Sequence, residues 1–296
     1  MTTTVRKSRS RLSTATTVRT GSTQRRANPL SALVRNPSGL AGVIIVLVWA
    51  IVALTWQFWA GNPLATNPMS TLQPPSMEHL LGTDSLGRDV LARVLAGSSS
   101  AMIIGPASTV LAMAGGILFG GLAGYLGGVA DEIIMRVMDF LLAFPAIIVA
   151  MILLGLFDSD LTTLIILLAL FFTPLVARTV RGSVLAVKSQ EYIDAARIRG
   201  ERTGYILVGE ILPNITGTLI VEATVRLSSA IVTAASLSFI GLGVQPPSPD
   251  WGLTIATEAS YLTIAWWSAI FPSLALGSLV VGAALLAEGA REGNDR

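Results

Sequence analysis

Six apolar stretches, separated by polar segments, run along this chain of 296 residues. Each is close to the roughly 20 apolar residues that an α-helix needs to cross the hydrocarbon core of a bilayer. The pattern predicts an all-α integral membrane protein with about six transmembrane helices. The predicted spans are residues 40–59, 103–125, 133–156, 161–180, 215–240 and 267–287.

Glycines and a proline within these spans bear on packing. Gly116, Gly120, Gly124 and Gly128 recur at every fourth position and place a stripe without side chains on one helix face. Such a stripe lets another helix approach closely, and a glycine-lined pathway is the alternative interpretation. In the third span, Pro145 predicts a kink, because proline lacks the amide hydrogen that the helix would use.

Composition supports the membrane assignment and narrows the chemistry. Hydrophobic residues make up 52% of the chain and charged residues 13%, about half the charged share of a soluble domain. The absence of cysteine excludes a disulfide framework, and a single histidine argues against a transition-metal site held by this chain alone. Motifs for nucleotide hydrolysis, serine hydrolysis and zinc proteolysis are also absent. We therefore expect a protein that is not an enzyme and binds no cofactor or metal itself.

Basic residues are concentrated at the start of the chain. Residues 1–27 are rich in Ser, Thr and Arg, which predicts a disordered tail. A targeting peptide and a nucleic-acid-binding arm are alternatives with less support. Because positive segments stay in the cytoplasm, the tail orients the first span. The basic residues before the first acidic residue, Glu78, are Arg6, Lys7, Arg9, Arg11, Arg19, Arg25, Arg26 and Arg35.

The loops agree with this orientation. Six spans place both termini in the cytoplasm and the segments 61–102, 157–160 and 241–266 outside. These outer segments contain only Arg88 and Arg93 as basic residues, whereas the inner segment 178–214 contains six. The predicted topology therefore follows the positive-inside rule.

The inner segment contains the sequence EYIDAARIRG at residues 191–200. The segment has acidic residues near its start, arginines near its end and Gly200 as its last residue. This order is typical of a short helix whose charges suit the helix dipole and which ends at a glycine. Ala195 and Ala196 would leave a low surface for another protein, with Tyr192 and Ile198 supplying apolar contact. A solvated linker helix is the alternative.

The rest of this loop carries a resemblance. DAARIRG (residues 194–200) followed by EILPN (residues 210–214) resembles the cytoplasmic EAA loop of permeases from binding-protein-dependent ABC importers. Asp194 stands where the general pattern has Glu, which keeps the charge. Ile211 lies one position closer to Leu212 than in that pattern, which fits the peptide-importer subfamily.

Three further stretches narrow the resemblance, which covers residues 28–291 but not the basic tail. HLLGTDSLGRDVLARVLAG (residues 79–97), ADEIIMRVMDFLLAFP (130–145) and LSFIGLGVQPPSPDWG (237–252) resemble segments of the dipeptide, oligopeptide and nickel importer permeases. The chain is most similar to the second of the two permeases in such systems.

The resemblance implies a type I ABC importer permease domain over residues 28–296, in a bacterial cytoplasmic membrane, with an EAA-type loop at 181–214. It implies four kinds of partner: a second homologous permease, two ATPase subunits or domains holding ATP and Mg, an extracytoplasmic substrate-binding protein, and lipid. Di- or oligopeptides are the expected substrate, with nickel or a nickel chelate as the alternative. The coupling residues would be Glu191, Tyr192, Asp194, Ala195, Ala196, Arg197, Gly200, Leu212 and Pro213.

A different class, an ion-coupled secondary transporter acting alone, would show inverted repeats and half-helices at the midplane, and we find neither in the sequence. Asp84, Arg88 and Asp89 lie in an outer loop, where they could contact the binding protein or cap a helix beginning near Asp84. His79 is more consistent with a hydrogen bond within this loop than with a nickel ligand.

Glu222 and Arg226 lie within the fifth predicted span. Their spacing places them on one helix face, and Arg226 would lie roughly 18 Å along the helix from Asn214. Charges in a membrane face a bundle interior or a water-filled cavity. The pair could lock the span to a neighbour or line the substrate path, and we favour the path.

Overall fold

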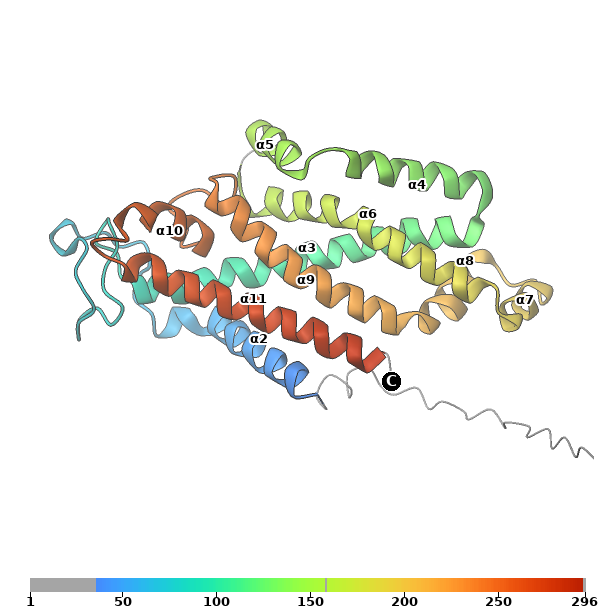
Figure 1. The fold of residues 1–296 in the computed structure, drawn as a ribbon, viewed down its shortest axis with the longest axis horizontal. Helices are drawn as coiled ribbons and strands as arrows, with labels where there is room; N and C mark the ends of the chain where they lie inside the picture. Colours follow the sequence, from blue (N-terminus) through green and yellow to red (C-terminus); the bar gives the residue numbers. More distant parts are fainter. Residues whose placement is uncertain (1–35, 158, 295–296) are drawn as a thin grey trace, which may run out of the picture.

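The computed structural model describes residues 36–157 and 159–294. Figure 1 shows an elongated helical bundle, and no strand occurs among the described residues. The predicted tail at residues 1–27 lies outside them. The helices are α2 (Pro37–Thr55), α3 (Val90–Leu126), α4 (Gly128–Ala143), α5 (Ala146–Leu156), α6 (Leu161–Lys188), α7 (Glu191–Ile198), α8 (Thr203–Tyr205), α9 (Thr216–Phe239), α10 (Trp251–Glu258) and α11 (Trp267–Asn294).

The arrangement has two distinct ends. We call the end that carries α7 the α7 end, and the opposite end, which carries α10 and residues 59–89, the α10 end (Figure 1). Helices α3, α6 and α9 form the middle, α2 lies beside α11 along one edge, and α4 with α5 lies along the other. Asn36 Nδ2 donates to Glu292 Oε2 at 2.6 Å, so α2 begins where α11 ends.

The membrane prediction is confirmed. Among the described residues, five helices are long and apolar enough to cross a membrane, and the pair α4–α5 gives a sixth crossing if it counts as one span. The third span differs from the expected kinked helix, because α4 and α5 are bent by 84°. Pro145 precedes α5 and holds Phe144 in an extended conformation (φ −87°, ψ 136°), which breaks the helix outright.

Two predicted outer loops are partly helical. The first was expected over residues 61–102 but ends at Asp89, whose side chain accepts a hydrogen bond from Ala92 N at 2.8 Å and caps α3. The second, 241–266, contains α10, which Asp250 caps through Leu253 N at 3.0 Å. Both helices begin with buried residues that lie outside the apolar stretches of membrane length. The length of those stretches alone therefore did not predict the helical residues here.

The glycine stripe is a close-packing surface. A Cβ on Gly116 would lie 2.3 Å from Val176 Cγ1, and one on Gly120 would lie 2.3 Å from the carbonyl oxygen of Ala177. Helix α6 therefore approaches the backbone of α3, as predicted. Gly128 lies beyond the end of α3, and a Cβ there would meet nothing within 4 Å.

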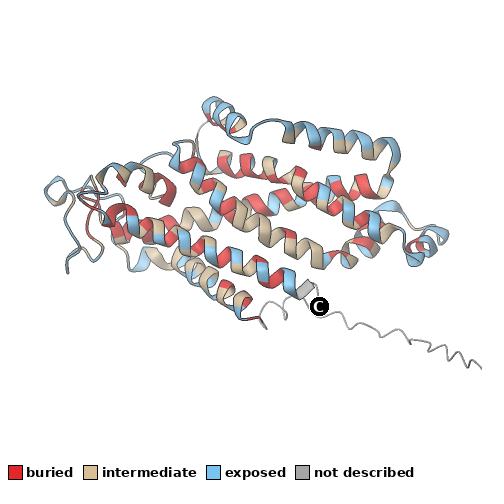
Figure 2. Cartoon of the chain, viewed as in Figure 1, coloured by how far each residue is buried: buried red, intermediate tan, exposed pale blue. Residues whose placement is uncertain are grey.

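Three apolar clusters fill the bundle. One joins α3, α5, α6 and α9, the second joins α3, α10 and α11, and the third joins α6 to α7 and residues 206–215. Figure 2 shows that α4, in contrast, is mostly exposed, and Met138 is its buried residue. The core therefore lies between α3, α6, α9 and α11.

We predict that Gly120→Ala destabilises the bundle by about 1–3 kcal/mol, because its methyl group would overlap the α6 backbone. Gly121→Ala is the matched control: a Cβ there meets nothing within 4 Å, and helix propensity favours alanine by up to about 1 kcal/mol. Thermal unfolding in detergent measures both. Equal stability of the two variants would show that α3 and α6 do not pack as described.

Candidate functional site

The predicted helix at the α7 end is present. Helix α7 spans Glu191–Ile198 and stands out at the extremity of the bundle (Figure 1). Glu191 and Asp194 lie in its first turn and Arg197 in its last, which suits the helix dipole. Gly200 adopts φ +77° and ends the helix, as the sequence predicts.

The two faces of α7 differ from the sequence expectation. Ile193 and Ala196 are fully buried against residues of α6 and residues 206–215. Ala196 therefore packs within its own chain and does not contribute to an exposed alanine surface. Ala195 and Tyr192 are exposed, and Ile198 is 87% exposed. The accessible face of α7 thus combines apolar groups with charges at both ends.

The end of the EAA-like loop lies beside the same apolar cluster. Residues 206–211 form one wide helical turn, and Leu212–Asn214 continues into α9. Leu212 is half-buried against the cluster, whereas Pro213 is exposed. The loop therefore connects α7 to α9 through packed residues, so a displacement of α7 would reach α9.

The charged pair of α9 also forms. Arg226 Nε lies 2.8 Å from Glu222 Oε1, and both side chains are largely buried. This is an ion-pair distance, but these two atoms lack a hydrogen bond of good geometry to any described residue. The Arg226 guanidinium also lies 5.8 Å from the ring centroid of Phe172 in α6. The two opposite charges are thus paired with each other within α9.

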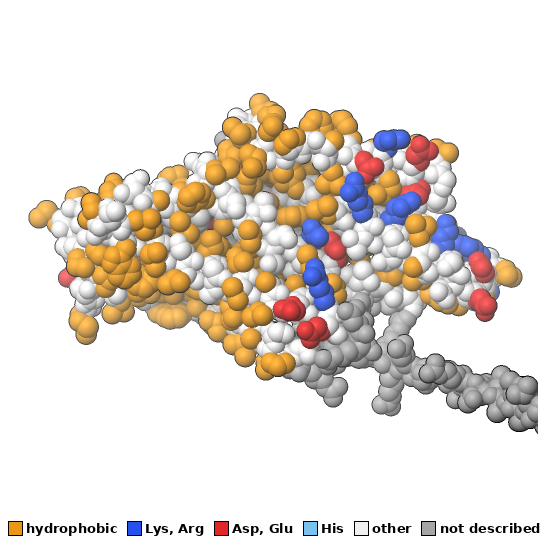
Figure 3. Space-filling view, in the orientation of Figure 1, with side chains coloured by type: hydrophobic (Ala, Val, Ile, Leu, Met, Phe, Trp, Pro, Cys, Tyr) orange, Lys and Arg blue, Asp and Glu red, His pale blue; other side chains and the backbone are white. Residues whose placement is uncertain are grey.

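Charged side chains gather toward the α7 end, whereas the half near α10 is mostly apolar in the view of Figure 3. Between α4 and α6, Arg181 binds Asp131 through two hydrogen bonds of 2.5 and 2.6 Å, and Arg178 binds Asp139 at 2.7 Å. Between α9 and α11, a cleft is lined by Ser228, Ser229, Glu288, Arg291 and Glu292, among others. Spacing along the chain did not predict these contacts, because each joins two different helices.

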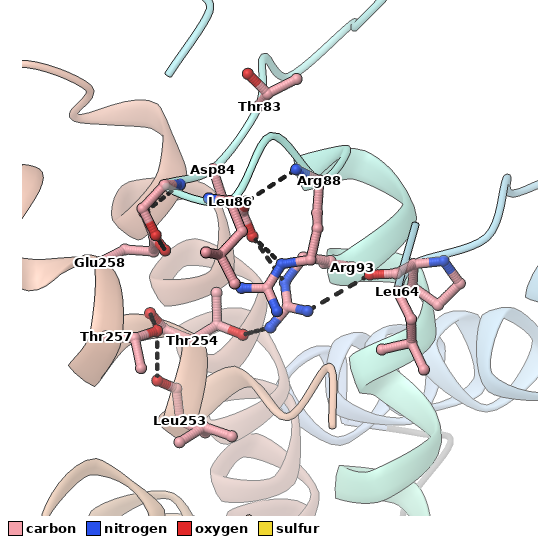
Figure 4. A network of polar contacts seen from close by, with 12 residues as sticks. Leu64, Thr83, Asp84, Leu86, Arg88, Arg93, Leu253, Thr254, Thr257 and Glu258 are labelled. Carbon is pink, nitrogen blue, oxygen red and sulfur yellow. Dashed lines mark hydrogen bonds and ion pairs between the residues drawn. The ribbon is translucent and has the colours of Figure 1, made fainter. Parts of the chain in front are cut away.

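At the α10 end, Asp84 forms the centre of a buried network (Figure 4). Its carboxylate accepts from Arg88 Nε at 2.6 Å and from Arg88 N at 2.9 Å, and Arg93 Nε lies 3.5 Å away. Arg93 Nη2 donates to Thr254 in α10 at 2.8 Å. Asp84 and Arg88 are buried, so these two do not offer the proposed contact with a binding protein.

The network fixes the outer loop to α10. Glu258, fully buried, accepts from Ser85 Oγ at 2.7 Å and from Ser85 N at 3.1 Å. The nearby Asp250 carboxyl has its pKa raised by burial, which the hydrogen bond from Leu253 N opposes. A buried acid needs a hydrogen-bonding partner. The only indication of this role in the sequence is that Glu258 stands alone in a long stretch without other charged residues.

The remaining predicted residues have local roles. Asp89 caps α3, as one of the two expected roles for this loop, although the helix begins at Val90 and not near Asp84. Asp89 also lies 2.9 Å from His79 Nδ1. The hydrogen bond predicted for His79 is thus confirmed. No group of three or more metal-ligating side chains occurs within residues 36–157 and 159–294.

The described residues form a helical bundle with five or six candidate crossings, and a short helix lies between two of them at one end, which defines a multi-pass membrane protein. Residues 116–291 match the family of binding-protein-dependent transport system inner membrane components, and the chain belongs to this family.

Similar proteins cover most of the chain. It is 33% identical to the dipeptide transport system permease protein DppC of Alkalihalophilus pseudofirmus, over 89% of this chain and 87% of that protein. It is 39% identical to the glutathione transport system permease protein GsiD of Pectobacterium atrosepticum, over 86% and 85%. It is 37% identical to the probable D,D-dipeptide transport system permease protein DdpC of Escherichia coli, over 85% of each.

Proposed function

We propose that this chain is one of two permease subunits of an ATP-driven importer for di- or oligopeptides in a bacterial cytoplasmic membrane. It forms half of the pore, and the ATPase subunits hydrolyse ATP with Mg. A second permease and an extracytoplasmic binding protein complete the importer. The observation that carries this proposal is α7, a helix with an exposed face and a buried face, placed between the spans α6 and α9.

The α7 end is the cytoplasmic end in this proposal. Exposed arginines, including Arg199 and Arg202, lie there, whereas Arg88 in the outer loop and Arg93 at the start of α3 are buried at the α10 end. The start of α2 and the end of α11 lie side by side, because Asn36 contacts Glu292. This arrangement supports an even number of crossings with both termini in the cytoplasm.

The exposed face of α7 fits an ATPase groove. Tyr192, Ala195 and Ile198 supply apolar contact, and Glu191, Asp194 and Arg197 supply charge at either end. The buried residues Ile193 and Ala196 join α7 to the core. Closure of the ATPases would move α7, and with it α6 and α9, as a packed unit.

The substrate class rests on the names of the relatives and on the α9 pair. The relatives are named for dipeptides and glutathione, and a peptide zwitterion carries one charge of each sign. Glu222 and Arg226 place opposite charges next to each other within α9, which matches the two charged ends of such a substrate. A nickel substrate has less support, because His79 is paired with Asp89.

We expect Ile198→Asp to release the ATPase while the permease still folds. Burying an isoleucine contributes about 1.5–3 kcal/mol, so association should weaken roughly ten- to a hundredfold. Copurification of tagged permease with ATPase measures it. Ala196→Asp is the matched variant on the buried face and should lower the amount of folded protein instead. An Ile198→Asp complex that retains ATPase and transport would refute docking through this face.

The α9 pair is tested by removing both charges together. Either single neutralisation leaves one charge unpaired, which costs about 3–5 kcal/mol when buried. The double variant Glu222→Gln with Arg226→Met should recover stability yet lose transport or change its preference among peptides. Complex yield and uptake of several labelled peptides are the measurements. Unaltered uptake of every peptide would assign the pair a purely structural role.

A further inference from the structure

Three helix ends meet at the side chain of Tyr125. Tyr125 lies in the last turn of α3, α6 ends at Lys188, and Arg197 lies in the last turn of α7. Lys188 Nζ is 5.7 Å from the centroid of the Tyr125 ring, and the Arg197 guanidinium carbon is 5.6 Å from it. One half-buried aromatic ring therefore contacts a cation from each of two other helices.

Both contacts are favourable on two grounds. A cation within about 6 Å of an aromatic ring centroid is attracted by the ring's negative face. A helix C-terminus also carries partial negative charge, and Lys188 Nζ donates to the Gly124 carbonyl oxygen of α3 at 3.4 Å. Arg197 is further held by Asp194 at 2.9 Å, which fixes the guanidinium between its own helix and the ring.

Tyr125 gives α7 a connection to α3 that differs from its other contacts. The buried side of α7, Ile193 and Ala196, packs against α6 and residues 206–215 through apolar groups, which fix its depth. The ring contacts Arg197, which lies one turn after Ile193 at the edge of this buried side, and so connects the last turn of α7 to the end of α3. Tyr125 itself is packed against the apolar cluster, which holds the ring in place.

We propose that Tyr125 is a positioning residue for energy coupling: held by Lys188 and Arg197, it fixes α7 relative to α3. Motion of α7 then passes to α3 as well as to α6 and α9, and the close contact of α3 with α6 carries it along the bundle. This proposal rests on the proposed function, in which α7 docks the ATPase.

The test compares Tyr125→Leu with Tyr125→Phe in the complete importer, reconstituted in liposomes with both permeases, the ATPases and the binding protein. Peptide uptake and ATP hydrolysis are measured on the same vesicles. Leucine keeps apolar volume without a π face, so uptake per ATP should fall on the order of tenfold, as expected for the loss of two such contacts. Phenylalanine keeps the ring and should stay within about twofold of the parent.

Two outcomes overturn the proposal: an unchanged ratio in Tyr125→Leu, or an equal fall in Tyr125→Phe, which would assign the effect to the hydroxyl. If Tyr125→Leu does not assemble, Lys188→Gln removes one cation and leaves the ring, and a fall of roughly threefold is expected. An unchanged ratio in that variant contradicts the proposal equally.

Failure of the proposed function is distinguishable in the same assay. If Ile198→Asp leaves the ATPase bound and uptake intact, the docking of α7 itself is wrong. If Ile198→Asp releases the ATPase while Tyr125→Leu keeps the parental ratio of uptake to hydrolysis, docking stands and only the role of Tyr125 is refuted.

Discussion

The rest of the structure depends on the contact between α3 and α6. Because Gly116 and Gly120 have no side chains, the α6 backbone lies directly against α3. In a bilayer, where lipid tails are as apolar as leucine, such packing is a main source of attraction between helices. These two helices also reach both ends of the molecule: α3 carries Arg93 near its start and Tyr125 near its end, and α6 leads into α7. The packed pair α3 and α6 therefore connects the two ends of the molecule.

The two ends are built by different means, which suits different tasks. At the α10 end, Asp84, Arg93 and Glu258 join three segments through buried charged contacts. Removing one partner from such a network leaves an uncompensated charge, so the outer loop and α10 are expected to move as one body. At the α7 end, α7 makes apolar contacts through Ile193 and Ala196 and a cationic contact with Tyr125, while Ala195 and Ile198 are exposed. This arrangement is consistent with a rigid outer platform and an inner docking helix.

Sequence patterns predicted the features that are set by residues close together along the chain. The glycine stripe, the end of α7 at Gly200 and the pairing of Glu222 with Arg226 all follow from spacings of a few residues. The structure differed from the sequence predictions where burial or pairing depends on segments that are distant along the chain. Ala196 is buried because α6 and residues 206–215 lie on its side of α7, and periodicity in eight residues cannot reveal that side. Ser85 and Glu258 pair across 173 positions, and the 84° bend at Pro145 exceeds what one proline predicts.

The central claim is that α7 faces the cytoplasm and is covered by an ATPase. The chain contains no cysteine, so single cysteines can be introduced at Ile198, exposed on α7, and at Thr71, exposed at the α10 end. Labelling with a membrane-impermeant thiol reagent is then measured in intact cells and in inverted vesicles, with and without bound ATPase. We expect Thr71→Cys to react in cells, and Ile198→Cys to react only in inverted vesicles stripped of ATPase. Reaction of Ile198→Cys in intact cells, or equal reaction with ATPase bound, would contradict the claim.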